Sequence, residues 1–412
     1  MTTETKDQVS QSDSRAGGLL AGIRVIEFAS VIMAPYATQQ LGDLGADVIK
    51  IEPPGGDMTR GMGAHRHPGM GGATLNLNRN KRSVVIDAKA PHGREAIEAL
   101  AATADVFVTN VRPDAMERLG LTADVLREIN PRLIYARGQG FRSDSPLRDR
   151  AAYDDIIQAA SGLVSLNHQV SGEPYFVPTV LADKICGMQI AQSVLAALVY
   201  RDRTGEGQSI EVPMVDTMLA FNLVEHLAAA TLDPEAPFGY RRALSTTRKA
   251  QRTADGWMCI LPYNDRNWRD FFTFVDRTEL IDDPRFRSMS TRADNADDLY
   301  RLVAELTPSR TSAQWQEFCD RVSIPAGPVL DLKAATETDY AHAGGLVVDA
   351  EHPTEGTYRL VANPVHYSVD PNPTMRHCPS IGEHTAEVLT EIGCAAMLAP
   401  SESATDMNGA HR

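Results

Sequence analysis

The stretch IRVIEFASVIMAPYATQQLGDLGADVIKIE, residues 23–52, decides the fold. It begins and ends in short runs rich in β-branched residues, and the segment between them has the length of a helix that ends near Leu44. Two strands joined in this way form a βαβ unit. The same alternation returns at SVVID (83–87), DVFVTN (105–110) and RLIYARGQG (132–140), with helical segments between them. The sequence therefore predicts an α/β fold with a large domain built on a mostly parallel, doubly wound sheet.

The second half of the chain has a different pattern of apolar and polar residues. Apolar residues at helical spacing predict one helix from about Lys184 to Arg203 and another from Met218 to Thr231, followed by an irregular, basic connection. A strand-like run at 255–263 and three amphipathic segments then predict a smaller α+β domain. From about residue 355 the chain returns to strand-like pieces and a last helix that would rejoin the first sheet.

A chain of 412 residues exceeds the length that one hydrophobic core usually serves, so we expect two domains. The predicted limits are a disordered tail at 1–17, a large domain formed by 18–215 with 355–400, linkers at 216–239 and 341–354, and a small domain at 240–340.

The composition limits which cellular compartment and which binding partners are expected. The five cysteines are an odd number without a CxxC pair, which argues against disulfides and a zinc ribbon and favours the reducing cytoplasm. No run of about eighteen apolar residues occurs, so we expect no membrane insertion. A net charge of −14 repels nucleic acid. A small anionic ligand would need a local basic cluster, such as those at 79–82 and 241–252.

Several catalytic motifs are absent from the sequence. The first strand-to-helix turn, FASVIMAPYA, has no G-x-G-x-x-G for a dinucleotide, and neither a Walker lysine loop nor a G-x-S-x-G elbow occurs elsewhere. His65 and His67 have no carboxylate or cysteine at ligand spacing, so we expect a surface loop there and no metal. The missing glycine motif disfavours redox use of a nicotinamide or flavin.

Seven blocks of the sequence, in this order, resemble the family III CoA-transferases of the CaiB/BaiF type. They are LAGIRVIEFASVIMAPYATQQLGDLGADVIKIEPPGGD, NLNRNKRSVVID, INPRLIYARGQGF, AAYDDIIQAASGL, TGEGQSIEVPMVD, IPAGPVLDL and IGEHTAEVL. The family includes formyl-CoA and carnitine CoA-transferases and α-methylacyl-CoA racemases. The resemblance runs from about Leu19 to Cys394 and implies an interlocked homodimer. In each chain a large Rossmann-like CoA-binding domain would be formed by both chain ends, with a small domain inserted.

The resemblance also implies a catalytic aspartate. In the family it lies just before the long helix that follows the AAYDDIIQAASGL block, and this position is Asp183, in LADKICG. A carboxylate can hold first an acyl group, as a mixed anhydride, and then CoA, as an aspartyl-CoA thioester. A reference pKa of about 3.9 and a place at a helix start predict that Asp183 is ionised at neutral pH. The alternative is that Asp183 only caps the helix, and the two roles can coexist.

By the family's pattern, CoA lies against the ends of the first-domain strands. The implied contacts are Val31, Ile32, Lys89, Asn110, Val111, Arg112, Arg118, Gln139, Gly140 and Phe141. Cationic side chains there would pair with phosphate oxygens, and the alternative for each is a solvated surface charge. CoA would then be a cosubstrate, and we expect no permanently bound cofactor.

Differences within the family bear on the reaction. Racemases carry a histidine where this chain has Tyr153, and a tyrosine with a pKa of about 10 is a poor base for moving an α-proton. The pattern therefore favours CoA transfer between acyl-CoA and small carboxylic acids. Two alternatives stay open: an acyl-CoA isomerase, acting by epimerisation or by intramolecular CoA transfer, and a non-catalytic CoA-binding protein.

Two further differences concern the substrate. Formyl-CoA transferases have a glutamine at the position of Ile32 and a run of glycines at the position of LSTTRKAQR (244–252), so use of oxalate or formyl-CoA is not predicted. In the family the acceptor acid would lie between the large domain of one chain and the small domain of the other. The basic segment from Arg241 to Arg252 is near that junction, and the alternative is a solvated basic linker.

Overall fold

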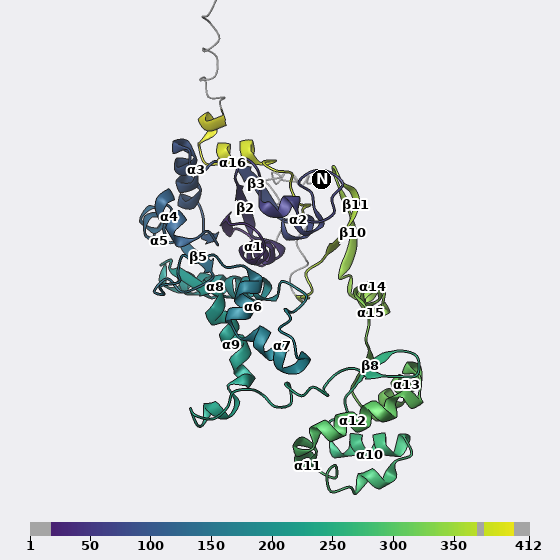
Figure 1. The fold of residues 1–412 in the computed structure, drawn as a ribbon. Coiled ribbons are helices and arrows are strands. Elements are labelled where there is room, and N and C mark those ends of the chain that lie inside the picture. Colours follow the sequence, from purple (N-terminus) through teal and green to yellow (C-terminus); the bar gives the residue numbers. More distant parts are fainter. Residues whose placement is uncertain (1–17, 369–374, 399–412) are drawn as a thin grey trace, which may run out of the picture. The chain divides into compact units, whose positions relative to one another are not determined.

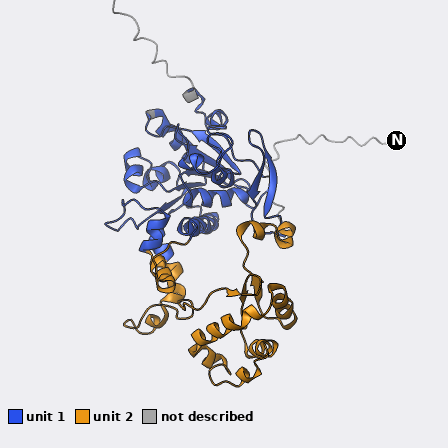
Figure 2. Cartoon of the chain, turned by 45° about the vertical axis from the view of Figure 1, so that its right-hand side comes forward, with its two compact units in different colours: residues 1–160, 178–218, 345–412 blue, residues 161–177, 219–344 orange. Residues whose placement is uncertain are grey.

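The computed structural model describes residues 18–368 and 375–398. The predicted tail and the very end of the predicted large domain lie outside the described residues. By its internal contacts the chain divides into two compact units, shown in Figure 2. Unit 1 comprises residues 1–160, 178–218 and 345–412, and unit 2 comprises residues 161–177 and 219–344. The domain limits predicted from the sequence stay a prediction, because contacts alone do not show which segments fold by themselves.

Unit 1 is built on a six-stranded parallel sheet in the order β3-β2-β1-β4-β5-β6. The strands are β1 (Arg24–Phe28), β2 (Asp47–Glu52), β3 (Lys81–Val85), β4 (Val106–Thr109), β5 (Ile134–Gln139) and β6 (Ser209–Pro213). The predicted α/β fold with a parallel sheet is confirmed. The order reverses between β1 and β4, and in open α/β sheets ligands bind at the carboxyl ends of the two strands at such a switch point.

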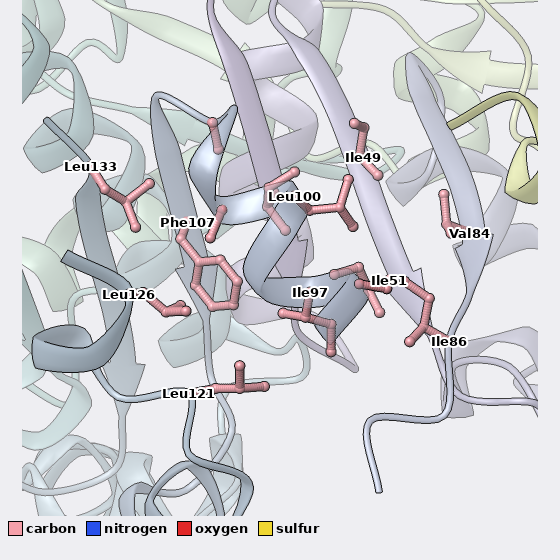
Figure 3. Close-up of a cluster of buried hydrophobic side chains, with 14 of the residues drawn as sticks. Ile49, Ile51, Val84, Ile86, Ile97, Leu100, Phe107, Leu121, Leu126 and Leu133 are labelled. Carbon is pink, nitrogen blue, oxygen red and sulfur yellow. The ribbon is translucent and has the colours of Figure 1, made fainter. Parts of the chain in front are cut away.

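Helices cover both faces of this sheet, as Figure 1 shows. One face is covered by α3 (Pro91–Ala102), α4 (Pro113–Leu119), α5 (Ala123–Ile129) and α16 (Thr385–Glu391), and the other by α1 (Met33–Asp43) and α8 (Leu181–Thr204). Ile49 and Phe107 point to the first face and pack against Ile97 and Leu100 of α3 (Figure 3), and Ile26 belongs to the same buried cluster. Side chains alternate along a strand, so the neighbours of these residues face α1 and α8. Both faces are therefore buried.

The carboxyl-terminal part of unit 1 rejoins the first part of the chain. An antiparallel hairpin beside α2 (Gly72–Leu77) is formed by β10 (Val347–His352) and β11 (Gly356–Val361). The Val361 N–H at the end of β11 donates a hydrogen bond to Oδ1 of Asn76 in α2 at 2.8 Å. The start of α16 is held to β3, because the His384 N–H donates to the Ser83 carbonyl at 2.9 Å and Thr385 Oγ1 accepts from the Val85 N–H at 3.0 Å. The last helix therefore packs against the edge strand, as predicted.

Unit 2 has a core of its own. A three-stranded antiparallel sheet, β7 (Gln251–Arg252), β8 (Trp257–Ile260) and β9 (Ala326–Pro328), accompanies α10 (Asp265–Phe274), α11 (Met289–Asp294), α12 (Ala296–Leu306) and α13 (Ser312–Val322). Trp315 is fully buried, stacks on Phe271 at 5.4 Å between ring centroids, and donates its indole N–H to the Thr307 carbonyl. The predicted strand and three amphipathic helices of this region are confirmed.

The remaining helices are short or lie at the edges of the units. They are α6 (Asp154–Ala160), α7 (Leu163–Ser171), α9 (Met214–His226), α14 (Leu332–Thr336) and α15 (Asp339–Gly344). Helix α9 begins four residues before its predicted start, and a separate 3-10 turn covers Ala228–Thr231. Within the described ranges, the helices are all too short or too polar to cross a bilayer.

Candidate active site

Asp183 lies in the first turn of α8. The helix begins at Leu181, its N-cap is Val180, and that residue offers no side-chain cap. Asp183 is the third residue of the helix, and only 8% of it is exposed. The alternative in which Asp183 serves as the N-cap is therefore wrong, because the carboxylate sits inside the helix and not before it.

Asp154, the first residue of α6, supplies the missing cap. Its Oδ1 accepts a hydrogen bond from the Asp183 backbone N–H at 3.0 Å, and its Oδ2 accepts one from Gln158 Nε2 at 2.5 Å. The first N–H groups of a helix lack intrahelical acceptors, and a negative charge near them is stabilised by the helix dipole. Asp154 is itself buried, so two aspartates from different helices meet away from water. Sequence reasoning missed Asp154, although the paired aspartates of AAYDDII were a signal.

The environment of Asp183 raises its pKa to about 7, first because the carboxyl is buried and second because the negative charge of Asp154 is close. The expectation of a fully ionised Asp183 at neutral pH is therefore wrong, since desolvation and a like charge both disfavour the charged form. Near pH 7 the acid and the carboxylate are present in similar amounts. A carboxylate of raised pKa, stripped of water, is a stronger nucleophile than a solvated one.

The first turns of α8 rest against the start of α1. A Cβ added to Gly187 would lie 2.5 Å from the Met33 carbonyl oxygen, so only glycine permits this approach. A Cβ added to Gly138 of β5 would lie 2.7 Å from Met33 Cε and 2.8 Å from Ile190 Cδ1. Met33 is thus enclosed by β5 and α8. Helix α1 directly follows Val31 and Ile32, which form the turn at the switch point. Asp183 lies in α8, and α8 is in direct contact with α1.

Val31, in the turn between β1 and α1, adopts a left-handed backbone conformation with φ of 68°. Such a φ is strained for a β-branched residue, and strain of this kind gathers at functional sites. The Val31 N–H donates to Asp57 Oδ1 at 3.2 Å, and Asp57 Oδ2 accepts from Lys50 Nζ at 2.7 Å. Lys50 also donates to the Ala29 carbonyl at 3.2 Å. One buried lysine therefore secures both the end of β1 and the residue that holds Val31.

Asn110, at the end of β4, holds the same turn from the other side. Its Oδ1 accepts from the Ser30 N–H at 3.0 Å, and its Nδ2 donates to the Ser30 carbonyl at 2.8 Å. The next residue, Val111, donates its N–H to Thr109 Oγ1 at 3.1 Å. The structure thus brings Val31, Asn110 and Val111 together at the carboxyl ends of β1 and β4.

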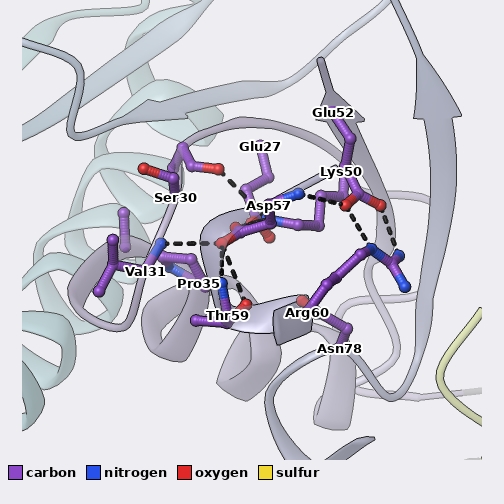
Figure 4. A network of polar contacts seen from close by, with 12 residues as sticks. Glu27, Ser30, Val31, Pro35, Lys50, Glu52, Asp57, Thr59, Arg60 and Asn78 are labelled. Atoms are coloured by element: carbon purple, nitrogen blue, oxygen red, sulfur yellow. Dashed lines mark hydrogen bonds and ion pairs between the residues drawn. The ribbon is translucent and has the colours of Figure 1, made fainter. Parts of the chain in front are cut away.

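A network of buried ions lies beneath this turn (Figure 4). Lys50 Nζ is 2.6 Å from Glu27 Oε1, and Lys81 Nζ is 2.7 Å from Glu27 Oε2. Burial alone would raise the pKa of Glu27, but the charges of Lys50 and Lys81 overcome it and lower the pKa to about 2. Arg60 pairs with Glu52 beside them at 2.6 Å. A paired buried network of this kind holds its members in fixed positions, and removing one partner leaves the others uncompensated.

The end of β5 contributes the next predicted contacts. Gln139 Nε2 donates to the Phe141 carbonyl at 2.6 Å and to Glu211 Oε1 at 2.7 Å. A Cβ added to Gly140 would lie 2.7 Å from the Cβ of Ala152, in the segment that leads into Asp154. Gly140 therefore lets the chain before α6 pass close to β5.

The predicted cationic contacts are all exposed. Arg112 occupies the N-cap position of α4, directly after the end of β4, and so follows Asn110 and Val111 at the switch point. Arg118 lies in the last turn of α4 and pairs with Asp114 at 2.8 Å. Lys89 follows β3, which is two strands away from β1, so the structure does not bring it to the others. The assignment of these residues to CoA stays a prediction.

Comparisons with known proteins agree on one family. The family model CoA-transferase family III matches residues 20–385. The human succinyl-CoA:glutarate CoA-transferase is 31% identical over 389 residues, covering 93% of this chain and 88% of that protein. The formyl-CoA:oxalate CoA-transferase of Escherichia coli O139:H28 is 32% identical, covering 91% of this chain and 95% of that protein.

Solved structures agree with these relatives. The Mycobacterium tuberculosis protein Rv3272 has a TM-score of 0.80 at 29% identity, covering 91% of this chain and 100% of that chain. A CaiB/BaiF family protein from Brucella suis has a TM-score of 0.78 at 28% identity, covering 90% and 99%. Fold and relatives together define an α/β transferase that acts on CoA esters. More specifically, this chain belongs to CoA-transferase family III, which confirms the predicted family and enzyme class.

Proposed function

We propose that this chain moves CoA from an acyl-CoA donor to a carboxylic acid acceptor, with Asp183 as the nucleophile. The observation that carries the proposal is the buried carboxyl of Asp183, whose backbone N–H is capped by the buried Asp154. Such a carboxyl is reactive toward a thioester and is also sheltered from bulk water, and a covalent anhydride needs both properties.

The first half of the reaction loads CoA onto the enzyme. The Asp183 carboxylate attacks the thioester carbonyl and the carbon–sulfur bond breaks. This step releases the CoA thiolate and forms an acyl-aspartyl anhydride. The thiolate then attacks the Asp183 side-chain carbonyl. This second attack releases the donor acid as its carboxylate and forms an aspartyl-CoA thioester. No proton or water is consumed.

The second half reverses these steps with the acceptor. Its carboxylate attacks the aspartyl-CoA carbonyl, which releases the thiolate and forms a new anhydride. The thiolate attacks the acceptor's acyl carbon, so acyl-CoA forms and the Asp183 carboxylate is regenerated. The thioester energy is retained because each bond broken is replaced by one of similar reactivity.

We propose that CoA lies at the switch point. Supporting residues are those at or just after the carboxyl ends of β1, β4 and β5: Val31, Ile32, Asn110, Val111, Arg112, Gln139, Gly140 and Phe141. The strained φ of Val31 and the double hold on Ser30 by Asn110 give this turn one conformation. A turn ordered before binding loses less entropy when the ligand arrives. Lys89 is a weaker candidate because it follows a distant strand, and Arg118 is now also weaker because it is ion-paired with Asp114.

Dicarboxylates are the proposed substrate class. Support comes from the human relative, which is named a succinyl-CoA:glutarate CoA-transferase. Succinyl-CoA with glutarate is therefore the first donor and acceptor pair to test. Tyr153 has 60% of its surface exposed and does not provide a buried base, so we expect no exchange of the α-hydrogen during turnover.

We also propose that the enzyme acts as a homodimer in the cytoplasm. The long helix α8 exposes Met188, Val199 and Tyr200, each about half exposed, and such apolar surface favours association with a second copy. All five cysteines are free, as in proteins of reducing compartments. Light scattering of the purified chain measures the mass; a monomer at all concentrations contradicts the dimer.

Trapping the intermediate tests the mechanism. Enzyme incubated with succinyl-CoA and then hydroxylamine is expected to carry a hydroxamate on Asp183, which peptide mass spectrometry locates. Asp183→Ala should lose turnover and the modification together. Asp155→Ala is the matched control, because Asp155 is the exposed neighbour of Asp154. Full turnover in Asp183→Ala, or a hydroxamate on another residue, contradicts the proposal.

A further inference from the structure

The two carboxylate oxygens of Asp57 bind different parts of unit 1 (Figure 4). Oδ1 accepts hydrogen bonds from the Val31 N–H at 3.2 Å, the Thr59 N–H at 2.9 Å and the Thr59 hydroxyl at 3.0 Å. Oδ2 accepts one from Lys50 Nζ at 2.7 Å and so forms an ion pair. Asp57 is only 5% exposed, so water competes little for these contacts. One oxygen therefore serves the turn before α1, and the other serves the buried ion network.

Val31 is an unusual residue for the left-handed backbone conformation. Within the described ranges, the non-glycine residues with a positive φ are Val31, Asn80, Ala228, Asp276 and Ser323. Val31 is the only β-branched residue among them, and a β-branched side chain disfavours this conformation more than asparagine or aspartate does. The turn therefore needs an interaction that offsets the strain at Val31. A hydrogen bond to a carboxylate oxygen is suited to this, because charge-assisted hydrogen bonds are stronger than neutral ones.

The residues on either side of Val31 are fixed by other side chains. Asn110 holds both backbone groups of Ser30, and Lys81 Nζ donates to the Pro35 carbonyl in the first turn of α1 at 2.8 Å. The Val31 N–H, in contrast, has Asp57 as its one acceptor among the described residues. Loss of Asp57 Oδ1 would therefore release the turn at Val31 while its two ends stay in place.

We propose that Asp57 is a positioning residue for CoA: through Oδ1 it keeps Val31 left-handed, so that the turn before α1 has the shape that receives the ligand. This inference rests on the proposed binding of CoA at the switch point. Oδ2 contributes to stability instead, through its ion pair with Lys50. When only a fraction of the molecules has the binding-competent turn, the apparent affinity falls by that fraction. Loss of the Oδ1 acceptor should therefore weaken CoA binding, whereas loss of the charge alone should not.

Asp57→Asn and Asp57→Ala separate the two roles. Both substitutions remove the negative charge that faces Lys50, so both should lower the unfolding temperature. Asparagine keeps one oxygen acceptor, and the three donors from Val31 and Thr59 should orient that oxygen as Oδ1 lies in the wild type. Alanine keeps no acceptor. In titration calorimetry, CoA should bind Asp57→Ala about tenfold more weakly than the wild type and Asp57→Asn within about twofold of it.

Asp105→Ala is the matched control. Asp105 also divides its oxygens between a cation and a backbone N–H, because Oδ1 is 2.9 Å from a guanidinium nitrogen of Arg201 and Oδ2 accepts from the Arg24 N–H at 2.8 Å. Arg24 begins β1 and Asp105 precedes β4, so these contacts lie at the opposite ends of the two strands that meet at the switch point. Asp105→Ala should cost stability but leave the affinity for CoA unchanged. If Asp57→Ala does not fold, Asp57→Leu takes its place, since leucine has nearly the shape of asparagine and no acceptor.

Hydrogen exchange without CoA tests the turn itself. Peptides that cover residues 29–35 should exchange faster in Asp57→Ala than in the wild type or in Asp57→Asn. With succinyl-CoA, the effect of Asp57→Ala should appear in KM and not in kcat, as expected for a residue that acts on binding. Failure of the wild-type protein to bind CoA would overturn the proposed function itself. If the wild type binds CoA, equal losses of affinity in Asp57→Ala and Asp57→Asn, or unchanged exchange in Asp57→Ala, would overturn only the positioning role.

Discussion

The backbone N–H of Asp183 donates a hydrogen bond to Oδ1 of Asp154 at 3.0 Å, so the candidate nucleophile and a second buried carboxylate are joined through a helix start. The contact stabilises the first turn of α8 and also keeps a negative charge close to the Asp183 carboxyl. One residue therefore affects both the local fold and the ionisation of the site.

The rate of CoA transfer should rise with pH through the pKa of Asp183, about 7, because only the carboxylate attacks the thioester. Burial is the main cause of the raised pKa of Asp183, and the negative charge of Asp154 adds to it. Asp154→Asn removes that charge, so the rising limb should move to lower pH. The measurement is kcat/KM for succinyl-CoA between about pH 5 and pH 9. Asp155→Asn serves as the control and should leave the profile unchanged. A profile that Asp154→Asn leaves in place, or moves upward, would contradict the assignment.

Asp183→Asn should stabilise the protein at high pH. The pKa of Asp183 is raised on folding, from 3.8 to about 7, so the proton it holds contributes stability in full below about pH 4. That contribution is lost as pH rises through 7. The neutral asparagine avoids the loss, and the gain at pH 8 should be about 2–4 kcal/mol, since one pKa unit is worth about 1.4 kcal/mol. Urea unfolding at pH 4 and pH 8 measures it; equal differences at both pH values would exclude a buried, charged Asp183.

Asn110→Ala should weaken CoA binding through the turn at Ser30. The substitution removes two hydrogen bonds to the Ser30 backbone and should cost about 2–3 kcal/mol of stability. Asn130→Ala is the matched control, because Asn130 Nδ2 also bonds two backbone carbonyls, of Ala101 and Ala104, away from the switch point. Both variants should lose similar stability, but only Asn110→Ala should raise KM for acyl-CoA. Equal effects on KM would indicate a structural role alone.

Lys50→Met should be strongly destabilising. It leaves Glu27 and Asp57 buried without their shared cation, a change that typically costs about 3–5 kcal/mol. Lys333→Met is the control, since its pair with Glu337 is exposed and exposed pairs contribute about 0–1 kcal/mol. Thermal unfolding of both variants is the measurement. A Lys50→Met protein as stable as the wild type would show that the network is not essential to unit 1.

The parallel sheet could be predicted from the sequence because its signal is local. Strands buried on both faces read as apolar runs such as VFVT in β4, and amphipathic helices such as α12 show their own periodicity. The sequence predicts α9 with a start four residues too late, because the pattern around Pro213 does not mark the first turn of this helix. The motif-based family assignment placed Asp183 at the start of α8.

The sequence by itself determined the α/β class, the family and the position of the candidate nucleophile, because each depends on residues that are near one another along the chain. Only the tertiary structure decided the chemistry of that nucleophile. Burial and the approach of Asp154 set the pKa of Asp183, and Lys50 and Asn110 set the conformation of the turn at Val31. These effects act between residues 21 to 80 positions apart along the chain, and such residues meet only when the chain folds.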